Sequence, residues 1–180
     1  CNMTYGCTDS LAINYDPTAT IDDGSCVYCT TLSANVSVTN PSCNGFSDGS
    51  VQVTASGGTG PYMYDLYIDS PPNFWASNNT GWFTGIGVQI WTVYVIDANG
   101  CMIVVPLQIV DPTPLTANIS VTNVSCNGGN DGTATVSVTG GTPPYSYYWT
   151  PMGATTQTIT GLGAGAYIVN ITDANNCVNS

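Results

Sequence analysis

The sequence predicts an all-β protein of two tandem immunoglobulin-like β-sandwiches preceded by a small disulfide-rich loop module. Three observations indicate this fold class: a long internal repeat, short runs of alternating β-branched and aromatic residues, and no helical periodicity over any stretch of 11 residues. Several short strands in about 80 residues, separated by regular turn signals, are typical of such a sandwich. The expected modules are residues 1–30, 31–112 and 113–180.

The internal repeat is the strongest sign of domain organisation. "LSANVSVTNPSCNGFSDGSVQVTASGGTGPY", which begins at Leu32, aligns without a gap to "LTANISVTNVSCNGGNDGTATVSVTGGTPPY", which begins at Leu115. The offset is 83 residues there, but only 76 between "DANGC" ending at Cys101 and "DANNC" ending at Cys177. The first copy therefore contains seven extra residues, which must lie between Tyr62 and Tyr94.

The expected strands lie between turn signals. The first copy contains "NVSVT", "SVQVTA", "WTVYVID" and "MIVVPLQIV", and the second contains "NISVT", "TATVSVT" and "AYIVNIT". Asn-Gly, Asp-Gly, Gly-Gly and Pro-Pro pairs bound these runs. The prolines of "DPTPLT" favour a short, stiff linker between the copies.

The two copies are expected to differ at their last strand. Cys101 is followed by the apolar run "MIVVPLQIVDP", whereas Cys177 is followed by Val178, Asn179 and Ser180. The second sandwich is therefore expected to lack its last strand and to have an open edge after 166–172. A strand from the next subunit could fill this edge and produce a head-to-tail fibre, or further residues of the same chain could complete the fold.

The charge of the chain restricts its partners and its chemistry. The 180 residues include no Lys, Arg, His or Glu, and the net charge of −11 comes from 11 Asp. Without basic groups, binding to nucleic acid or to anionic membranes is disfavoured. No apolar run is long enough for membrane insertion. The usual general bases and catalytic triads cannot be assembled, so we expect no enzyme.

The eight cysteines indicate disulfides rather than a metal site. They are widely spaced and no His accompanies them, which makes zinc a weak alternative. Disulfides form in oxidising compartments, so we expect an extracellular or cell-surface location. Four of these cysteines lie in the first module: Cys1, Cys7, Cys26 and Cys29. The preferred pairing is Cys7 with Cys26 and Cys1 with Cys29, but the sequence alone does not choose among three arrangements.

The repeated segments resemble a known family. "SCNGFSDGSVQVTASGGTGPY" with "DANGC", and "SCNGGNDGTATVSVTGGTPPYSYYW" with "GLGAGAYIVNITDANNC", resemble the SprB-type repeat of large cell-surface proteins in gliding and other Bacteroidota-like bacteria. This resemblance covers about four fifths of the chain. It implies an extracellular, repetitive structural or adhesive protein and names no ligand. Within each sandwich the corresponding cysteines are expected to pair, Cys43 with Cys101 and Cys126 with Cys177, which would stabilise each fold by roughly 4 kcal/mol.

The opening segment is expected to bind calcium. Its "GCTD…A.NY.P.A…DDGSC" pattern resembles an Asp-rich module found in similar secreted proteins and thrombospondin type 3 calcium repeats. The candidate Ca²⁺ ligands are Asp9, Asn14, Asp16, Asp22 and Asp23, which are hard oxygen donors of the kind that Ca²⁺ prefers. Four carboxylates without a basic partner would otherwise repel one another. A solvated acidic loop that uses Asp in turns is the alternative, and the spacing is not that of an EF-hand.

Other polar residues suggest turns and glycosylation. Asp48 and Asp131 precede Gly, and Asp97 and Asp173 begin Asp-Ala-Asn turns, so each is expected to bind its own backbone rather than calcium. Asp-Ser-Leu at Ser10 resembles an O-glycosylation site of Bacteroidota. Six N-x-[ST] sequons are candidate glycosylation sites: Asn2, Asn35, Asn78, Asn118, Asn123 and Asn170.

Two functional classes follow from these features. In the first, the chain is a structural subunit or segment of a bacterial cell-surface filament or stalk, and its partners are copies of itself or further repeats of the same chain. In the second, it is an adhesive module that binds surface glycans. Phe74, Trp75 and Trp82 would then stack on sugar rings beside Asn73 and Asn78, although core or interface packing is the favoured explanation for these aromatic residues.

Overall fold

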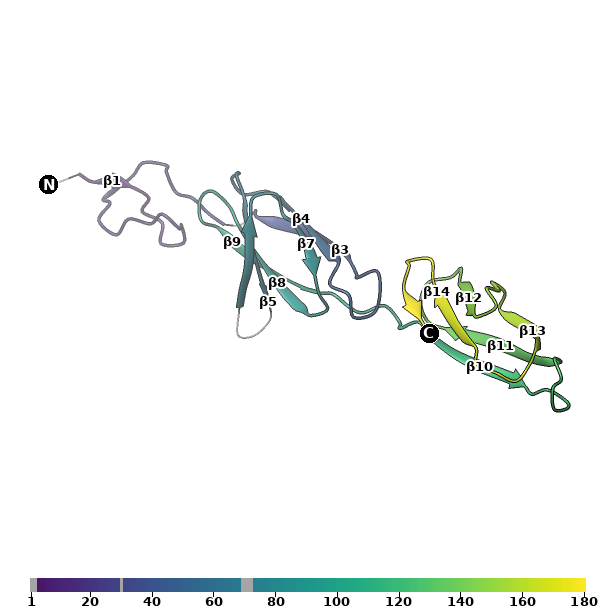
Figure 1. Ribbon diagram of the computed structural model, residues 1–180. Coiled ribbons are helices and arrows are strands. Elements are labelled where there is room, and N and C mark those ends of the chain that lie inside the picture. The colour runs from purple at the N-terminus through teal and green to yellow at the C-terminus, as the bar shows by residue number, and fades with distance from the viewer. Residues whose placement is uncertain (1–2, 30, 69–72) are drawn as a thin grey trace. The chain divides into compact units, whose positions relative to one another are not determined.

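The computed structural model describes residues 3–29, 31–68 and 73–180. All the regular secondary structure in these residues is β-strand, which confirms the all-β fold class with tandem sandwiches (Figure 1). The chain forms two compact units, Cys1–Asn40 with Ser47–Val110, and Pro41–Phe46 with Asp111–Ser180. The second unit thus includes a loop from the first repeat. The expected boundaries of three modules stay a prediction.

The opening segment has little regular structure. Strands β1 (Tyr5–Gly6) and β2 (Ile21–Asp22) pair in parallel. Cys7 is buried and forms a disulfide with Cys26, which confirms that expected pair. The remainder consists of turns, so this segment depends on a cross-link rather than on a hydrophobic core.

The first sandwich consists of two antiparallel sheets. One has the strand order β3-β4-β7 and the other β6-β5-β8-β9. Their alternating burial follows the period of two that a half-buried strand requires, as in Gly49–Ser56. The bounds are β3 (Ser33–Thr39), β4 (Gly49–Ser56), β5 (Met63–Ile68), β6 (Asn73–Asn78), β7 (Trp82–Ile86), β8 (Ile90–Ile96) and β9 (Met102–Gln108).

The second sandwich repeats this arrangement with fewer strands. Its sheets have the orders β10-β11-β13 and β12-β14-β15. The registers match those of the first copy, since Ser33 pairs with Ser56 and Thr116 with Thr139. The bounds are β10 (Thr116–Thr122), β11 (Gly132–Thr139), β12 (Ser146–Thr150), β13 (Thr158–Leu162), β14 (Ile168–Thr172) and β15 (Val178–Asn179).

The extra residues of the first copy lie where the sequence places them. Leu66 pairs with Val93 in the first sandwich, and Trp149 pairs with Val169 in the second, so the offset has already changed from 83 to 76 between these strands. The first copy has an additional edge strand, β6, against β5. The second copy has instead a short turn closed by a bridge from Trp149 to Ala154.

The two cores use large aromatic residues at different positions. In the first, Leu66 and Trp91 are buried. The equivalent residues of the second are Trp149, which is buried, and Tyr167, which is partly buried. The tryptophan of the core thus lies on β8 in the first sandwich and on β12, the equivalent of β5, in the second.

The last strands differ most. In the first sandwich β9 pairs with the whole of β8, from Ile90 opposite Gln108 to Ile96 opposite Met102. In the second, β15 pairs with β14 at Ile171 and Thr172 alone. Within the described residues, the first part of β14 has β12 on one side and no strand on the other.

Candidate functional site: the aspartate-cysteine corners and the groove

Each sandwich contains a tight corner that begins at an Asp and ends at a Cys, which we name the Asp-Cys corner. In the first repeat it spans 97–101. Oδ1 of Asp97 accepts hydrogen bonds of 2.9 Å from the backbone N–H groups of both Asn99 and Cys101. The N–H of Asp97 donates to the carbonyl of Cys101 at 2.9 Å. These bonds fix the direction in which the cysteine leaves the corner.

The corner also binds the Gly-Gly-Thr loop of the same sandwich. Oδ2 of Asp97 accepts the N–H of Thr59 at 2.9 Å, and the N–H of Ala98 donates to the carbonyl of Thr59 at 2.8 Å. Gly58 has a φ of +60°, and a Cβ there would lie 2.6 Å from Oδ2 of Asp97. Glycine is therefore required for the loop to approach the carboxylate.

The second repeat reproduces the corner at 173–177. Oδ1 of Asp173 accepts the N–H groups of Asn175 and Cys177 at 2.8 and 2.9 Å, and Oδ2 accepts that of Thr142 at 2.8 Å. Gly141 takes the role of Gly58, with a φ of +61°. The recurring Gly-Gly and Asp-Ala-Asn motifs are thus two halves of one hydrogen-bonded structure.

Both aspartates are buried and remain ionised. The N–H of Thr59 lowers the pKa of Asp97, and the N–H groups of Cys101 and Asn99 also lower it, against the opposing effect of burial. Burial raises the pKa of Asp173, but the N–H groups of Thr142, Cys177 and Asn175 more than offset this, so the pKa lies below its usual value. Each Asp-Cys corner therefore holds a carboxylate that is neutralised by backbone dipoles.

The cysteines of the two corners bond to cysteines that lie upstream. Cys101 forms a disulfide with Cys29, and Cys177 forms one with Cys43. The expected pairs of Cys43 with Cys101 and of Cys126 with Cys177 are therefore wrong. The expected pair of Cys1 with Cys29 is also wrong, because Cys29 is bonded to Cys101. Cys1 itself lies outside the described residues.

The geometry of the sandwich explains the correction. The N–H of Val110, just beyond the end of β9, donates to Oδ1 of Asn40 just beyond the end of β3, so these two strand ends lie together. Cys43 follows that end, whereas Cys101 immediately precedes β9. The seven residues of β9 span about 23 Å. This separation exceeds the roughly 7 Å between Cα atoms that a disulfide can bridge.

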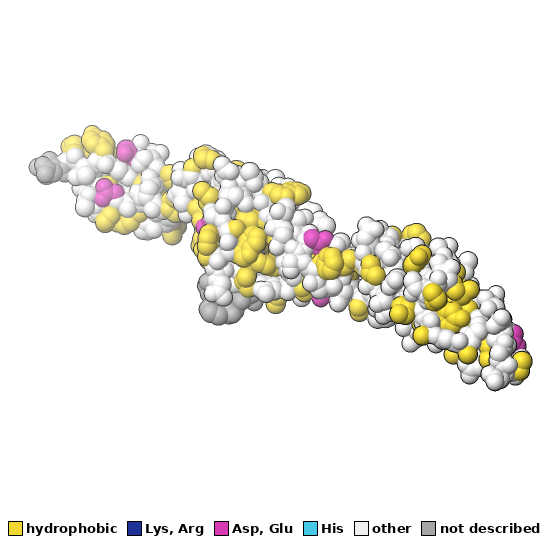
Figure 2. All heavy atoms as spheres, in the orientation of Figure 1, with side chains coloured by type: hydrophobic (Ala, Val, Ile, Leu, Met, Phe, Trp, Pro, Cys, Tyr) yellow, Lys and Arg dark blue, Asp and Glu magenta, His cyan; other side chains and the backbone are white. Residues whose placement is uncertain are grey.

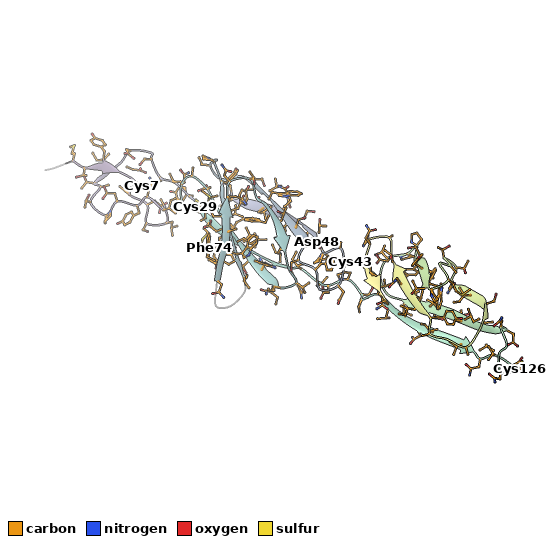
Figure 3. All side chains as sticks on the ribbon, in the orientation of Figure 1. Cys7, Cys29, Cys43, Asp48, Phe74 and Cys126 are labelled. Carbon is orange, nitrogen blue, oxygen red and sulfur yellow. A yellow bond between two sulfur atoms is a disulfide. The ribbon has the colours of Figure 1, made fainter. Side chains whose placement is uncertain are left out.

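Cys126 is the equivalent of Cys43 in the second repeat, and it has a free thiol. Its side chain is exposed, whereas Cys43 is buried. Figure 3 shows Cys126 on the loop that joins β10 and β11. The two equivalent cysteines thus differ in bonding although their sequence surroundings match.

A groove of about 630 Å³ opens onto the second core. Its lining comes from β10, β11, β12 and β13 and from residues 163–167, which directly precede β14. Figure 2 shows hydrophobic side chains gathered on a face of this unit. Ile119, which lines the groove, is 49% exposed, whereas its equivalent Val36 packs against the first core. The principal apolar lining residues are Ile119, Val121, Ala134, Trp149, Leu162 and Tyr167.

The candidate calcium ligands take part in local turns. Oδ1 of Asp16 accepts the N–H and the hydroxyl of Thr18, and Oδ1 of Asp22 and of Asp23 accept the N–H groups of Gly24 and Ser25. Asp9 accepts the phenol of Tyr28 at 2.6 Å, and this bond lowers the pKa of its carboxyl group.

These contacts do not bring the carboxylates together. The side-chain amide of Asn14 joins two segments of the loop. Its Nδ2 donates to the carbonyl of Ser25, and its Oδ1 accepts the N–H of Val27. The described residues contain no group of three or more Asp, Glu, His or Cys side chains arranged to hold a metal ion. Calcium binding by these residues therefore stays a prediction.

Asp97, Asp131 and Asp173 accept backbone N–H groups, and some of these bonds cross between loops. Asp131 accepts the N–H of Ser125 six residues earlier, and Ser125 lowers the pKa of its carboxyl group. Asp131 is thus a loop clamp rather than part of a hairpin turn. The cross-loop bonds of Asp97 and Asp173 were not predicted from the sequence. The pairing of the Gly-Gly and Asp-Ala-Asn motifs in both copies was the signal that could have found them.

The candidate sugar-stacking residues are exposed but do not form one described cluster. Phe74 and Trp75 lie on β6, where they make edge-to-face contacts with Tyr67 and Trp91, and Trp82 begins β7 in the other sheet. Their exposed fractions are 58%, 41% and 52%. Asn73 is exposed beside Phe74. Sugar binding by these residues stays a prediction.

The glycosylation candidates differ in accessibility. Ser10, Asn35, Asn118 and Asn123 are exposed, Asn170 is partly buried in β14, and Asn2 lies outside the described residues. Nδ2 of Asn78 donates to the carbonyl of Trp82 at 3.0 Å, while its Oδ1 accepts the N–H groups of Thr80 and Gly81. Attachment at Asn78 would break a turn, so the exposed sites are the better candidates.

Comparison with known proteins finds a repeat family that matches part of each sandwich. Residues 35–68 and 118–154 match the SprB repeat. No curated protein matches the chain. A solved structure of three N-terminal domains of the bacteriophage RB49 Highly Immunogenic Outer Capsid protein (Hoc) is similar, with 16% identity and a TM-score of 0.44. That similarity covers 78% of this chain and 53% of the Hoc chain.

The matched segments agree with the structural repeat. Each begins in the first strand of a sandwich and continues beyond the Gly-Gly loop. SprB repeats occur in cell-surface proteins, and the three disulfides among the described residues fit an extracellular location. The described part of the chain contains no helix with the length and hydropathy of a membrane span. One segment of each sandwich therefore matches the SprB repeat.

Proposed function

We propose that the chain is a non-enzymatic structural protein of the bacterial cell surface, a subunit or segment of a filament or stalk in which the second sandwich receives a strand from another copy or from a further repeat. The groove on the second core supports this proposal most directly. In the first sandwich Leu107 and Ile109 fill the core beside β8. The second core has a groove instead, and residues 163–167, which directly precede β14, form part of its lining.

The position of the groove indicates which strand would fill it. The N–H of Ile109 donates to the carbonyl of Gln89 at 3.0 Å. The equivalent of Gln89 is Gly165, which lines the groove. A strand with the pattern of β9 would therefore bring an Ile to the groove and pair its backbone with the edge of β14. Such β-augmentation combines main-chain hydrogen bonds with pockets for alternate side chains.

The source of the strand is either another copy or another repeat of the same chain. An edge strand from a second copy would give a head-to-tail contact, which propagates into a fibre if the rotation does not close. A further repeat in the same chain would give a covalent stalk. Both arrangements use the same contact, and both need no catalytic group.

A peptide with the sequence of residues 102–112 tests the groove directly. We expect the peptide to bind the full chain and to slow amide hydrogen exchange in β14, since its backbone would pair with that edge. Exchange in β8 should not change, because β9 already covers it. The measurement is hydrogen exchange followed by mass spectrometry, with calorimetry for the affinity.

The control is the same peptide with the L107N and I109N substitutions. It keeps the backbone but removes the two side chains that fill the first core, so it should bind at least about tenfold more weakly. Equal protection of β14 by both peptides, or protection by neither, would overturn the proposed strand exchange. Fibres whose formation depends on protein concentration would identify the second copy as the source.

Adhesion to glycans is the second candidate function, favoured by the exposed aromatic residues of the additional strand β6. Trp75 is 41% exposed and its ring is already held at 5.6 Å from that of Trp91. A preoriented indole is suited to stacking on a sugar ring. We expect W75A to abolish any signal on a glycan array, while W82A tests the other sheet. Binding that survives both substitutions would exclude this site.

A further inference from the structure

We propose that Cys126 is the attachment point of another SprB repeat, through a disulfide to the cysteine of that repeat's Asp-Cys corner. The partner is identified by its chemistry: a corner of the Asp-Ala-Asn-x-Cys type preceded by an Asp-Pro linker. The inference rests on the proposed function in one respect, since both require a further repeat. It names a different site, on the loop between β10 and β11.

The first observation is the bonding of the equivalent cysteine. Cys43 precedes Cys126 by the repeat offset of 83 residues, and it is bonded to Cys177 of an Asp-Cys corner. The corner cysteine of the first repeat, Cys101, is likewise bonded upstream, to Cys29. Both corners in the chain thus use an upstream cysteine. Cys126 occupies the same upstream position and remains free.

The second observation is that the loop of Cys126 already has the bonded conformation. The carbonyl of Cys43 accepts the N–H of Phe46 at 3.1 Å, and the carbonyl of Cys126 accepts that of Gly129 at 2.9 Å. The glycine two residues after each cysteine has a φ of +79°. The turn is therefore the same with and without the disulfide, so little conformational entropy is lost on bonding.

The third observation is that the contacts around the bonded cysteine can be reproduced at Cys126. The carbonyl of Ser42 accepts Nδ2 of Asn175 at 3.2 Å, Nδ2 of Asn44 donates to the carbonyl of Pro112, and the N–H of Gly45 donates to Oδ1 of Asp111. The second repeat carries Ser, Asn and Gly at the three equivalent loop positions, 125, 127 and 128. These groups would receive the corner Asn and the Asp-Pro linker of an incoming repeat.

The chemistry of bond formation is thiol–disulfide exchange. Two thiols each lose a proton and together lose two electrons to an oxidised dithiol partner, such as a periplasmic or extracellular thiol oxidase. In the test that partner is glutathione disulfide. Each disulfide formed releases two molecules of reduced glutathione, so atoms and electrons balance.

An extended chain provides the experiment. Residues 1–177 are continued by a second copy of residues 102–180, in which the added copy of Cys126 is replaced by Ser. After refolding with a glutathione redox pair, peptide mapping should find the original Cys126 linked to the added corner cysteine, and the thiol should no longer react with iodoacetamide. Mixing ¹⁵N-labelled and unlabelled chains distinguishes bonds within one chain from bonds between copies.

A displaced thiol is the matched control. In the extended chain with C126S and S120C, a cysteine lies on exposed β10 but outside the preformed turn. It should not couple to the added corner. Coupling of this displaced thiol to the same extent as Cys126, or an original Cys126 that stays reactive while the added repeat is folded, would overturn the inference.

The same chain separates this inference from the groove. Amide exchange in β14 reports whether the added strand fills the groove, and peptide mapping reports the disulfide. Protected β14 with a free Cys126 would contradict only the disulfide. A mapped bond with unprotected β14 would contradict only the strand exchange. Folding of the added repeat is confirmed independently by protection of its copies of β11 and β14.

Discussion

At the scale of single residues, the fold stabilises two buried carboxylates without any side-chain cation. Asp97 and Asp173 are each 5% exposed, yet no Lys, Arg or His exists to pair with them. Backbone N–H groups take that role, three to each carboxylate. Among the described residues, no buried side-chain nitrogen or oxygen lacks a hydrogen-bond partner. Backbone dipoles are thus sufficient to bury an anion in this fold.

Acid should loosen the second sandwich through Asp173. Because the folded pKa of this carboxyl group lies below its unfolded value of about 3.9, its contribution to stability is fully present above about pH 4 and is lost as the pH falls through the folded pKa. We expect the Tm of the second sandwich to fall as the pH is lowered below about 4. In D173N the Tm should be lower by at least about 5 °C at pH 6 and should vary less with pH.

Calorimetry across this pH range checks the expectation. The first sandwich serves as the control within the same molecule, since it retains Asp97 and its three N–H donors. Its transition should keep the pH dependence of the unmodified chain. A D173N chain with the same acid sensitivity as the unmodified chain in its second sandwich would show that other groups control acid unfolding.

At the scale of strands, local patterns predicted most of the sheet structure. The alternation in "GSVQVTAS" and "GTATVSVT" gives the observed buried faces of β4 and β11, and the turn residues mark their ends. The gapless alignment between the repeats predicted equal registers for β3 with β4 and β10 with β11. Local periodicity determines these features, so one sequence was enough to predict them.

The disulfide pairing could not be predicted from local sequence patterns. Because the cysteines occupy equivalent positions in the two repeats, a disulfide within each repeat was expected. Two loops can be joined by a disulfide only if they lie at the same end of the sandwich, and the strand directions decide which loops do so. Cys43 follows β3, and Cys101 precedes β9, the strand whose far end meets β3. Pairing therefore depends on topology, which the sequence constrains only through the whole fold. The difference between the last strands of the two sandwiches was predicted because the residues that follow Cys101 and Cys177 could be compared between the copies.

At the scale of the whole chain, the compact units do not coincide with the sequence repeats. The loop Pro41–Phe46 comes from the first repeat but belongs to the second unit, together with its bonded Cys177. The Cys29–Cys101 and Cys43–Cys177 disulfides join residues that are 72 and 134 positions apart in the sequence. Each therefore connects two segments that the repeat boundaries would separate. A fragment cut at the linker after Val110 would lose the partner of Cys43.

We expect the opening segment to respond to calcium independently of the sandwiches, because its Cys7–Cys26 disulfide lies outside both hydrophobic cores. Chelation should expose residues 3–29 to a protease that cuts after aromatic and Leu residues, since their four carboxylates would then repel one another. Both sandwiches should stay folded, because their aspartates bind backbone N–H groups. Trypsin cannot serve, since the chain has no Lys or Arg.

Calorimetry with excess chelator and with added calcium measures the effect, and proteolysis followed by mass spectrometry locates it. D22N with D23N removes two candidate ligands and should abolish the difference between the two conditions, whereas D65N, in β5 of the first sandwich, should not. The Asx turns at Asp16, Asp22 and Asp23 already use one carboxylate oxygen each. A calcium ion would have to take the second oxygens and draw the turns together. Identical melting and cleavage with and without chelator would therefore mean that hydrogen bonds to backbone, and not a cation, hold this acidic segment in its fold.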